Sequence, residues 1–96
     1  MGCAGFEWDE AKNQENRIKH GVAFEEAVRA FRDPKRVIIK DMDHSLSEER
    51  YHCMGMIERG IVTVRFTYRG KGVRILGAGY WRRGRKTYEE KNQIHG

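Results

Sequence analysis

The 96-residue chain has little that would place it in a membrane or an oxidising compartment. It has no apolar run near the roughly 18 residues that a membrane-spanning helix needs. Its first residues contain neither the basic stretch nor the apolar stretch of an export signal. We therefore expect a cytoplasmic protein whose two cysteines, Cys3 and Cys53, are reduced thiols. Cys53 lies in a strand-like run, which predicts a small core residue, and neither cysteine has neighbours typical of a catalytic thiol.

Internal repeats, linkers and low-complexity segments are also missing, which predicts a single domain over residues 1–96. A chain of this length buries only one modest core. Oligomerisation or a tightly bound partner is therefore favoured as a further source of stability, and a homodimer is one possibility.

Acidic residues are scarce in the last third of the chain. Residues 69–96 contain eight Lys and Arg but two Asp and Glu, whereas residues 1–68 contain 11 and 12. Such a cationic tract next to a nearly neutral body attracts polyanions or acidic proteins.

The cationic tract also contains aromatic residues. Cations neutralise phosphates and aromatic rings stack on unpaired bases, so the pattern favours RNA. The alternative is that the cations form a solvated face and the aromatic residues belong to the core, with Trp81 anchoring the last helix on the sheet. Arg74 and Tyr80 are an even number of residues apart, which predicts that they share one strand face. The tract comprises Arg65, Arg69, Lys71, Arg74, Arg82, Arg83, Arg85 and Lys86, with Tyr68, Tyr80, Trp81 and Tyr88.

The first half of the chain predicts a short strand over residues 5–8 and two helices. Asp9 is a suitable N-cap for a helix that ends at His20, with Gly21 after it. The apolar stripe of this helix is thin, mainly Ala11 and Ile18, which predicts a surface helix. The second helix is expected over residues 22–32, because Phe24, Ala27, Val28 and Phe31 follow helical spacing.

The second half has the period-two pattern of strands, expected over residues 37–39, 50–57, 61–68 and 73–80. A last helix is expected over residues 81–93, although Gly84 lies within it. Grouped helices and grouped strands indicate the α+β class. We expect a small antiparallel sheet, built from the N-terminal strand and three or four others, packed by two N-terminal helices and a C-terminal helix.

Lys19 and His20 form the first candidate site. The C-terminal end of a helix is its negative pole, which favours a charged histidine. The pair could contact a phosphate or transfer a proton, or it could simply cap the helix.

The acidic stretch from Asp41 to Arg50 is a second candidate. It lacks the central glycine and terminal glutamate of a calcium loop, and His44 with His52 makes only half of a zinc site. We expect instead a turn capped by Asp and Ser, with Glu49 or Arg50 pairing across strands and no metal.

Three motifs occur in an order that resembles the BrnT toxin family. They are Phe6-Glu-Trp8-Asp9-Glu-Ala-Lys, Lys19-His20-Gly21-Val22-Ala-Phe24-Glu-Glu-Ala27, and Asp43-His44-Ser45 with Glu48-Glu49-Arg50. The resemblance covers residues 6–90, and Phe-x-Trp-Asp with Lys-His-Gly is its most specific part.

The resemblance implies a metal-free, cofactor-free ribonuclease toxin with a RelE-like fold, acting in the bacterial cytoplasm. It further implies a cognate BrnA antitoxin as partner, with a heterotetramer as one alternative assembly, and operator DNA contacted only through that antitoxin. In one respect the chain departs from the family pattern. The basic residues expected at the end of the last strand fall on Gly79 and Tyr80.

These observations give one set of candidate residues and two hypotheses. The candidate catalytic residues are His20, Lys19, Arg74, Arg82 and Arg50, and the candidate RNA-binding residues are Arg69, Lys71, Tyr80, Trp81, Arg83 and Arg85. Metal-free RNA cleavage needs proton transfer and stabilisation of negative charge at phosphorus, which such residues supply. The alternative hypothesis is a non-catalytic module that binds RNA or an antitoxin.

Overall fold

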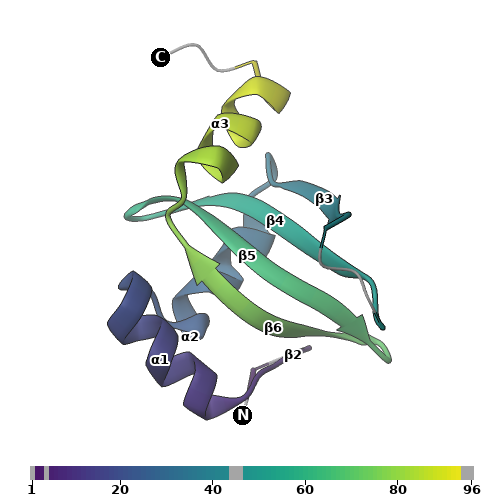
Figure 1. The fold of residues 1–96 in the computed structure, drawn as a ribbon. Coiled ribbons are helices and arrows are strands. Elements are labelled where there is room, and N and C mark those ends of the chain that lie inside the picture. The colour runs from purple at the N-terminus through teal and green to yellow at the C-terminus, as the bar shows by residue number, and fades with distance from the viewer. Residues whose placement is uncertain (1, 4, 44–46, 94–96) are drawn as a thin grey trace.

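A computed structural model describes residues 2–3, 5–43 and 47–93. Figure 1 shows a twisted sheet with α1 and α2 on one side and α3 on the other. The sheet order is β1-β2-β6-β5-β4-β3. The elements are β1 (Gly2–Cys3), β2 (Phe6–Glu7), α1 (Glu10–His20), α2 (Phe24–Ala27), the 3-10 helix η1 (Val28–Arg32), β3 (Val37–Asp41), β4 (Arg50–Ile57), β5 (Gly60–Arg69), β6 (Gly72–Gly79) and α3 (Arg82–Lys91). The α+β class is confirmed.

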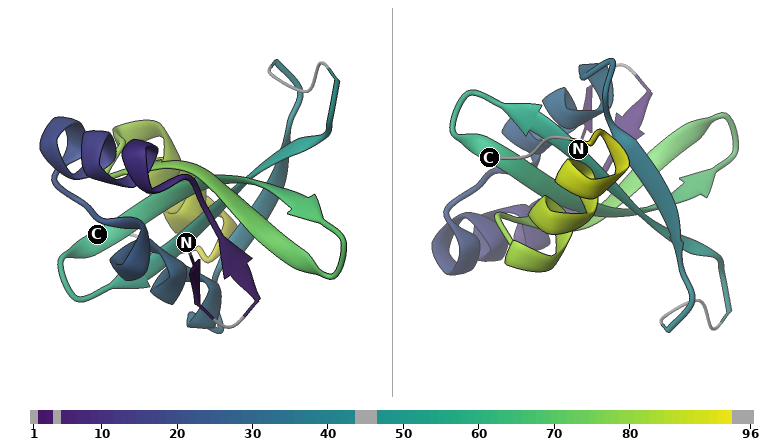
Figure 2. Two further views of the ribbon diagram at one scale, coloured as in Figure 1. Left: turned by 90° about the horizontal axis from the view of Figure 1, so that it is seen from below. Right: turned by 90° about the horizontal axis from the view of Figure 1, so that it is seen from above.

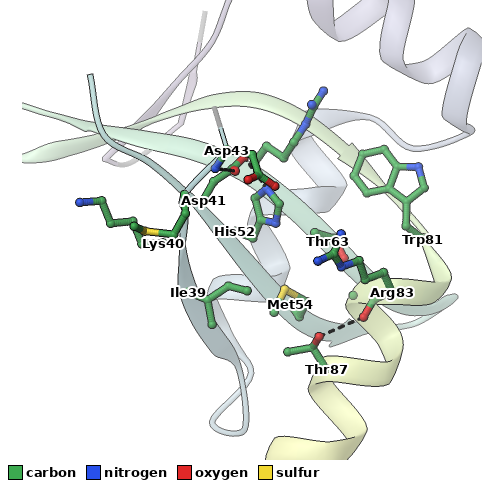
Figure 3. A pocket seen from close by; sticks show the side chains of 13 residues that line it. Ile39, Lys40, Asp41, Asp43, His52, Met54, Thr63, Trp81, Arg83 and Thr87 are labelled. Atoms are coloured by element: carbon green, nitrogen blue, oxygen red, sulfur yellow. Dashed lines mark hydrogen bonds and ion pairs between the residues drawn. The ribbon is translucent and has the colours of Figure 1, made fainter. Parts of the chain in front are cut away.

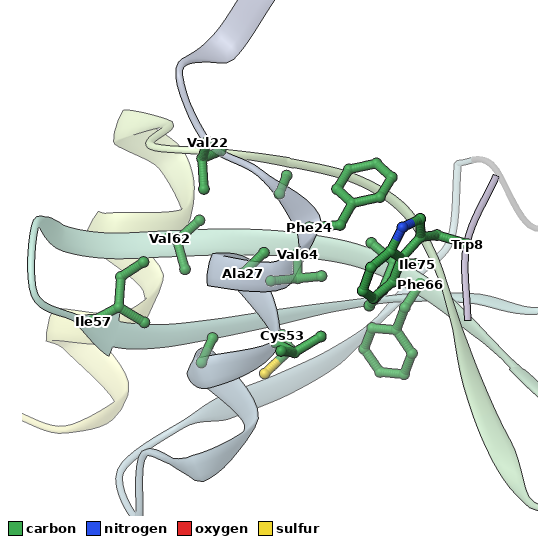
Figure 4. Packing of buried hydrophobic residues seen from close by; sticks show 13 residues of the cluster. Trp8, Val22, Phe24, Ala27, Cys53, Ile57, Val62, Val64, Phe66 and Ile75 are labelled. Carbon is green, nitrogen blue, oxygen red and sulfur yellow. The ribbon is translucent and has the colours of Figure 1, made fainter. Parts of the chain in front are cut away.

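The central strands β4, β5 and β6 form an antiparallel meander whose inner face carries the main core. Alternate residues of β5, including Val64 and Phe66, point to this face and are fully buried. They pack against Phe24 and Ala27 of α2 (Figure 4). Cys53 belongs to this cluster, as predicted, and burial raises the pKa of its thiol to about 12.

The prediction of an antiparallel sheet is wrong at one pairing. Strand β2 runs parallel to β6, with Phe6 opposite Val73. The alternation of apolar residues gives the buried face of a strand but not its direction. Here the helices and the strands β3, β4 and β5 lie between β2 and β6 along the chain, although β2 and β6 are neighbours in the sheet.

Helix α1 has the predicted ends but a different inner face. The Asp9 carboxylate accepts a hydrogen bond from the Ala11 amide at 2.8 Å, and Gly21 adopts the left-handed conformation with φ of 70°. Ile18 is 88% exposed, whereas Asn13 and Asn16 are buried. The predicted stripe is therefore wrong, and α1 packs through amide hydrogen bonds.

Asn16 joins α1 to the edge of β6 beyond the short β2 pairing. Its amide nitrogen donates to the Ala78 carbonyl at 2.9 Å, and its amide oxygen accepts from the Ala78 N–H at 3.2 Å. The same nitrogen donates to the Val22 carbonyl at 2.9 Å. These bonds fix the end of α1, and with it His20, beside the last strand.

The second predicted helix is present but changes type. Its first part is α2, and from Val28 onward it is the 3-10 helix η1. The predicted apolar stripe faces the core, although Phe31 at its end is only half-buried.

Helix α3 covers part of the outer face of the sheet, as both views in Figure 2 show. Its Tyr88 packs with Met54 and Ile61. Gly84 lies in this helix, and a Cβ there would collide with the Thr63 hydroxyl, so the glycine allows the helix to approach β5. No helix of the described residues is long and apolar enough to cross a membrane.

Candidate functional site

The outer face of the sheet is open between α1, β3 and α3, and two hollows lie there. The first, called here the cationic hollow, has a volume of about 320 Å³. It is lined by Lys12, Glu15, Asn16, Lys19, His20, Asp41, Arg50, Arg65 and Leu76. It therefore brings together three of the predicted catalytic residues: Lys19, His20 and Arg50.

His20 reaches the hollow from the last turn of α1. Its ring lies edge-on to the Trp81 indole, with 5.2 Å between centroids and 76° between planes. Trp81 stands directly before α3, so this contact joins the predicted helix-end histidine to the predicted aromatic residue. Because 60 residues separate His20 and Trp81 along the chain, the sequence does not predict this contact.

Arg65 is the site residue that sequence reasoning missed. It was part of the basic tract but not among the candidate catalytic or binding residues. Its guanidinium carbon lies over the Trp81 ring, 5.6 Å from the centroid, which is a cation–π geometry. Arg65 lines both hollows and thus stands at their junction.

Two glycines of β6 make room for this arrangement. A Cβ built on Gly77 would lie 2.8 Å from Nη2 of Arg65. A Cβ built on Gly79 would lie 2.6 Å from Cε2 and Cζ2 of Trp81. The departure from the family pattern at Gly79 thus coincides with the place where the indole lies against the strand.

The second hollow, called here the apolar hollow, lies between β3 and α3 (Figure 3). Its volume is about 560 Å³. Figure 3 shows Ile39 on one side, Met54 at the floor and Trp81 on the other side. The Asp41 carboxylate accepts a hydrogen bond from Nε2 of His52 at 3.0 Å. The remaining lining residues are Lys40, Met42, Asp43, Thr63, Arg65, Arg83, Gly84 and Thr87.

Several predicted site residues lie outside the cationic hollow and form ion pairs. Arg74 pairs with Glu7 at 2.7 Å, on the edge where β2 meets β6. Arg69 and Arg85 pair with Glu48 at 3.9 Å and with Glu89 at 3.4 Å, respectively.

The other predicted cations are spread over the surface. Arg83 lines the apolar hollow, and Arg82 lines a third hollow beside Tyr80 and Trp81. Lys71 is exposed in the turn between β5 and β6. The structure therefore divides the basic tract rather than collecting it in one place.

The prediction that Arg74 and Tyr80 share a strand face is wrong. The register of β6 against β5 shifts by one residue, because Phe66 pairs with Ile75 and Arg65 pairs with Gly77. This bulge reverses the alternation beyond it. Tyr80 consequently packs against the main core, where burial raises the pKa of its phenol, and Arg59 lies over its ring.

The acidic stretch has the predicted structural role as far as it is described. The Asp41 carboxylate accepts a hydrogen bond from the Asp43 amide at 3.1 Å, which caps a turn. Glu49 pairs with Lys40 across the strands at 2.9 Å. His44 and Ser45 lie outside the described residues. Among those described, no group of three or more His, Cys, Asp or Glu side chains could hold a metal ion.

Comparison with known proteins identifies one family. A family model described as "Ribonuclease toxin, BrnT, of type II toxin-antitoxin system" matches residues 8–84. The match includes all three strands of the meander and the residues of the cationic hollow. No curated protein matches the chain.

Proposed function

The chain belongs to the BrnT family of ribonuclease toxins of type II toxin–antitoxin systems, and we propose that it cleaves RNA in the cationic hollow. One observation carries this proposal. Lys19 and His20 from α1, Arg50 from β4 and Arg65 from β5 converge on one open hollow. Four cationic or ionisable donors around such a space suit a phosphate and the extra negative charge of a pentavalent phosphorus.

The chemistry proposed is attack of a 2′-hydroxyl on the adjacent phosphorus, with loss of the 5′-oxygen. We assign proton transfer to His20, because an imidazole ring can both accept and donate a proton. Arg65 and Arg50 hold the phosphate oxygens, and Lys19 adds positive charge beside them. This positive charge comes from side chains, so we propose that no metal ion takes part.

Arg65 replaces Arg74 in this assignment. Arg74 is already neutralised by Glu7 at 2.7 Å and does not line the hollow. We assign Arg74 and Arg82 to peripheral contacts with the RNA backbone, together with Arg69, Lys71 and Arg85.

The family implies an antitoxin partner. We propose that a BrnA-like antitoxin neutralises the chain in the bacterial cytoplasm by covering the cationic hollow. Operator DNA would be contacted through that antitoxin, in a complex that contains one or two copies of each chain.

The test uses the purified protein with total RNA, with and without ribosomes, in excess EDTA. We expect cleavage by the wild type and a loss of about 100-fold or more in Arg65→Ala, the order found when one charge-stabilising donor is removed. Arg32→Ala is the matched control, because Arg32 is exposed on η1, away from the hollow.

Arg74→Ala separates the structural assignment from the sequence-based one. It is expected to retain most of the activity, and it should not relieve the growth arrest that the induced wild type causes in a bacterial host. RNA left intact by the wild type under every condition would contradict the proposal. RNA bound but uncut would favour the non-catalytic binding module.

A further inference from the structure

The apolar hollow is not needed for the phosphate chemistry, yet it adjoins the place where that chemistry would occur. Arg65 and Asp41 line both hollows, so the two spaces adjoin at these residues. Its volume of about 560 Å³ falls within the range typical of sites for small ligands.

The walls of this hollow suit a flat aromatic group. Met54 is buried at its floor, while Ile39 on β3 remains 37% exposed and Met42 78% exposed. The Trp81 indole forms the opposite side (Figure 3). Large exposed apolar side chains around one concave space indicate a binding site more than a solvated surface.

Polar groups lie around the apolar floor. Arg83 offers guanidinium nitrogens, and the His52 ring, which is hydrogen-bonded to Asp41 through Nε2, offers Nδ1. This combination of apolar surfaces and edge hydrogen bonding matches the two properties of a nucleobase.

We propose that the apolar hollow holds the unpaired base of a nucleotide adjacent to the phosphate in the cationic hollow. The inference rests on the proposed function, because the neighbouring phosphate places the base there. In duplex RNA the base faces are stacked and inaccessible, so the ligand is single-stranded RNA. The hollow is then a subsite that selects unpaired nucleotides.

The alternative occupant is an apolar side chain of the antitoxin. The position of the hollow beside a cationic site favours the base, because a nucleotide places a base and a phosphate side by side. The antitoxin is therefore included as an outcome of the test.

The test compares two fluorescein-labelled oligomers of equal charge by fluorescence anisotropy at low salt. One is a non-cleavable 2′-O-methyl hexanucleotide, and the other has the same phosphates with every base removed. We expect the wild type to bind the base-bearing oligomer about tenfold more tightly, the effect of stacking one base. Tryptophan emission should fall with this oligomer alone, since Trp81 lines the hollow while Trp8 is buried.

Ile39→Ala and Ile38→Ala form a matched pair of variants. The two residues are adjacent in β3 and similarly exposed, at 37% and 41%, but only Ile39 lines the hollow. We expect Ile39→Ala to reduce the base preference roughly threefold or more, because it removes an apolar wall. Ile38→Ala should leave the preference unchanged, and affinity for the abasic oligomer should be the same in all three proteins.

The outcomes separate the two proposals. If neither oligomer binds the wild type, both the cationic site and the inference fail. If both bind equally well, only the base subsite fails. If the preference for the base-bearing oligomer survives Ile39→Ala, the base binds elsewhere and the proposal is wrong. If Ile39→Ala also loses affinity for the antitoxin, the hollow is a binding site for the antitoxin.

Discussion

Two glycines of β6 leave room for the side chains of the candidate site. Gly77 and Gly79 leave open the space in which the Arg65 guanidinium and the Trp81 indole lie. A side chain at either position would have to displace one of these two groups. The absence of a basic residue at Gly79 is thus compatible with a site whose cation comes from β5 instead of β6.

Gly77→Ala is expected to displace Arg65 while leaving the fold intact. The nearest atom to the added Cβ is Nη2 of Arg65, 2.8 Å away, which is the far end of a flexible side chain. We expect RNA cleavage to fall about tenfold or more, as for a misplaced catalytic group, with a thermal midpoint close to that of the wild type. Cleavage rates and thermal denaturation measure the two effects.

A double-mutant cycle provides the control for Gly77→Ala. In an Arg65→Ala background the extra methyl group has nothing to displace, so Gly77→Ala should have no further effect on cleavage. Additive losses would show that Gly77 acts on RNA independently of Arg65, and the proposed link would be wrong.

At the scale of elements, a half-buried carboxylate ties α3 to the rest of the chain. Asp33, after η1, accepts a hydrogen bond from the Tyr88 hydroxyl at 2.6 Å and from the Met56 and Lys35 amides at 2.7 and 2.8 Å. Burial acts to raise the pKa of Asp33, but these hydrogen bonds outweigh it and hold the pKa below 3.8. Burial and the bond to Asp33 raise the pKa of Tyr88 to about 12.

Tyr88→Phe is expected to destabilise the protein by about 1 to 3 kcal/mol near neutral pH, because it removes a partly buried hydrogen bond to a charged group. The contribution of Asp33 to the free energy of unfolding is present above pH 3.8 and is lost as the pH falls through the lower pKa of the folded state. The contribution of Tyr88 to the free energy of unfolding is present below pH 10 and is lost as the pH rises toward 12. The stability difference between the two proteins should therefore shrink at both extremes.

Chemical denaturation from acid to alkaline pH measures this difference. Tyr51→Phe is the control, because its hydroxyl donates to Glu49, whose side chain is 62% exposed. The effect of Tyr51→Phe on the free energy of unfolding should remain below about 0.5 kcal/mol. A constant cost for Tyr88→Phe at every pH would show that packing, rather than the bond to Asp33, holds α3 in place.

The elements that follow local rules could be predicted from the sequence, while those set by distant partners could not. Asp9 and Gly21 define the ends of α1 through hydrogen bonds within two to four residues. The bulge in β6 depends on its pairing with β5 and is invisible in the sequence of β6 alone. The inner face of α1 was missed because Asn16 is buried by hydrogen bonds to Ala78, 62 residues away.

The same distinction applies to the site. Lys19 and His20 could be proposed from the sequence because the end of a helix is a local feature with a known electrostatic polarity. Arg65 was passed over because its role depends on Gly77 across the strand pair and on Trp81 beyond it. Arg74 was preferred on sequence grounds because nothing nearby reveals its ion pair with Glu7, 67 residues away.

At the scale of the whole molecule, the net charge of +5 does not show which cations are available to RNA. Arg69, Arg74 and Arg85 are each paired with a glutamate. Among the described residues, Lys19, Arg65 and Arg83 form no ion pair with a carboxylate. These three cations lie around the two hollows, so they are placed to attract a polyanion to that part of the surface.

Arg83→Ala and Arg85→Ala remove the same charge from the first turn of α3, which makes them a matched pair. Arg83 is free to contact a phosphate, whereas Arg85 must first leave Glu89, 3.4 Å away. We expect Arg83→Ala to lower the slope of log affinity against log salt by about 0.7, the value for one single-strand phosphate contact. Arg85→Ala should change it by less. Titrations with a non-cleavable oligomer between roughly 50 and 300 mM salt resolve this difference, and equal slopes would show that RNA senses only the net charge of the chain.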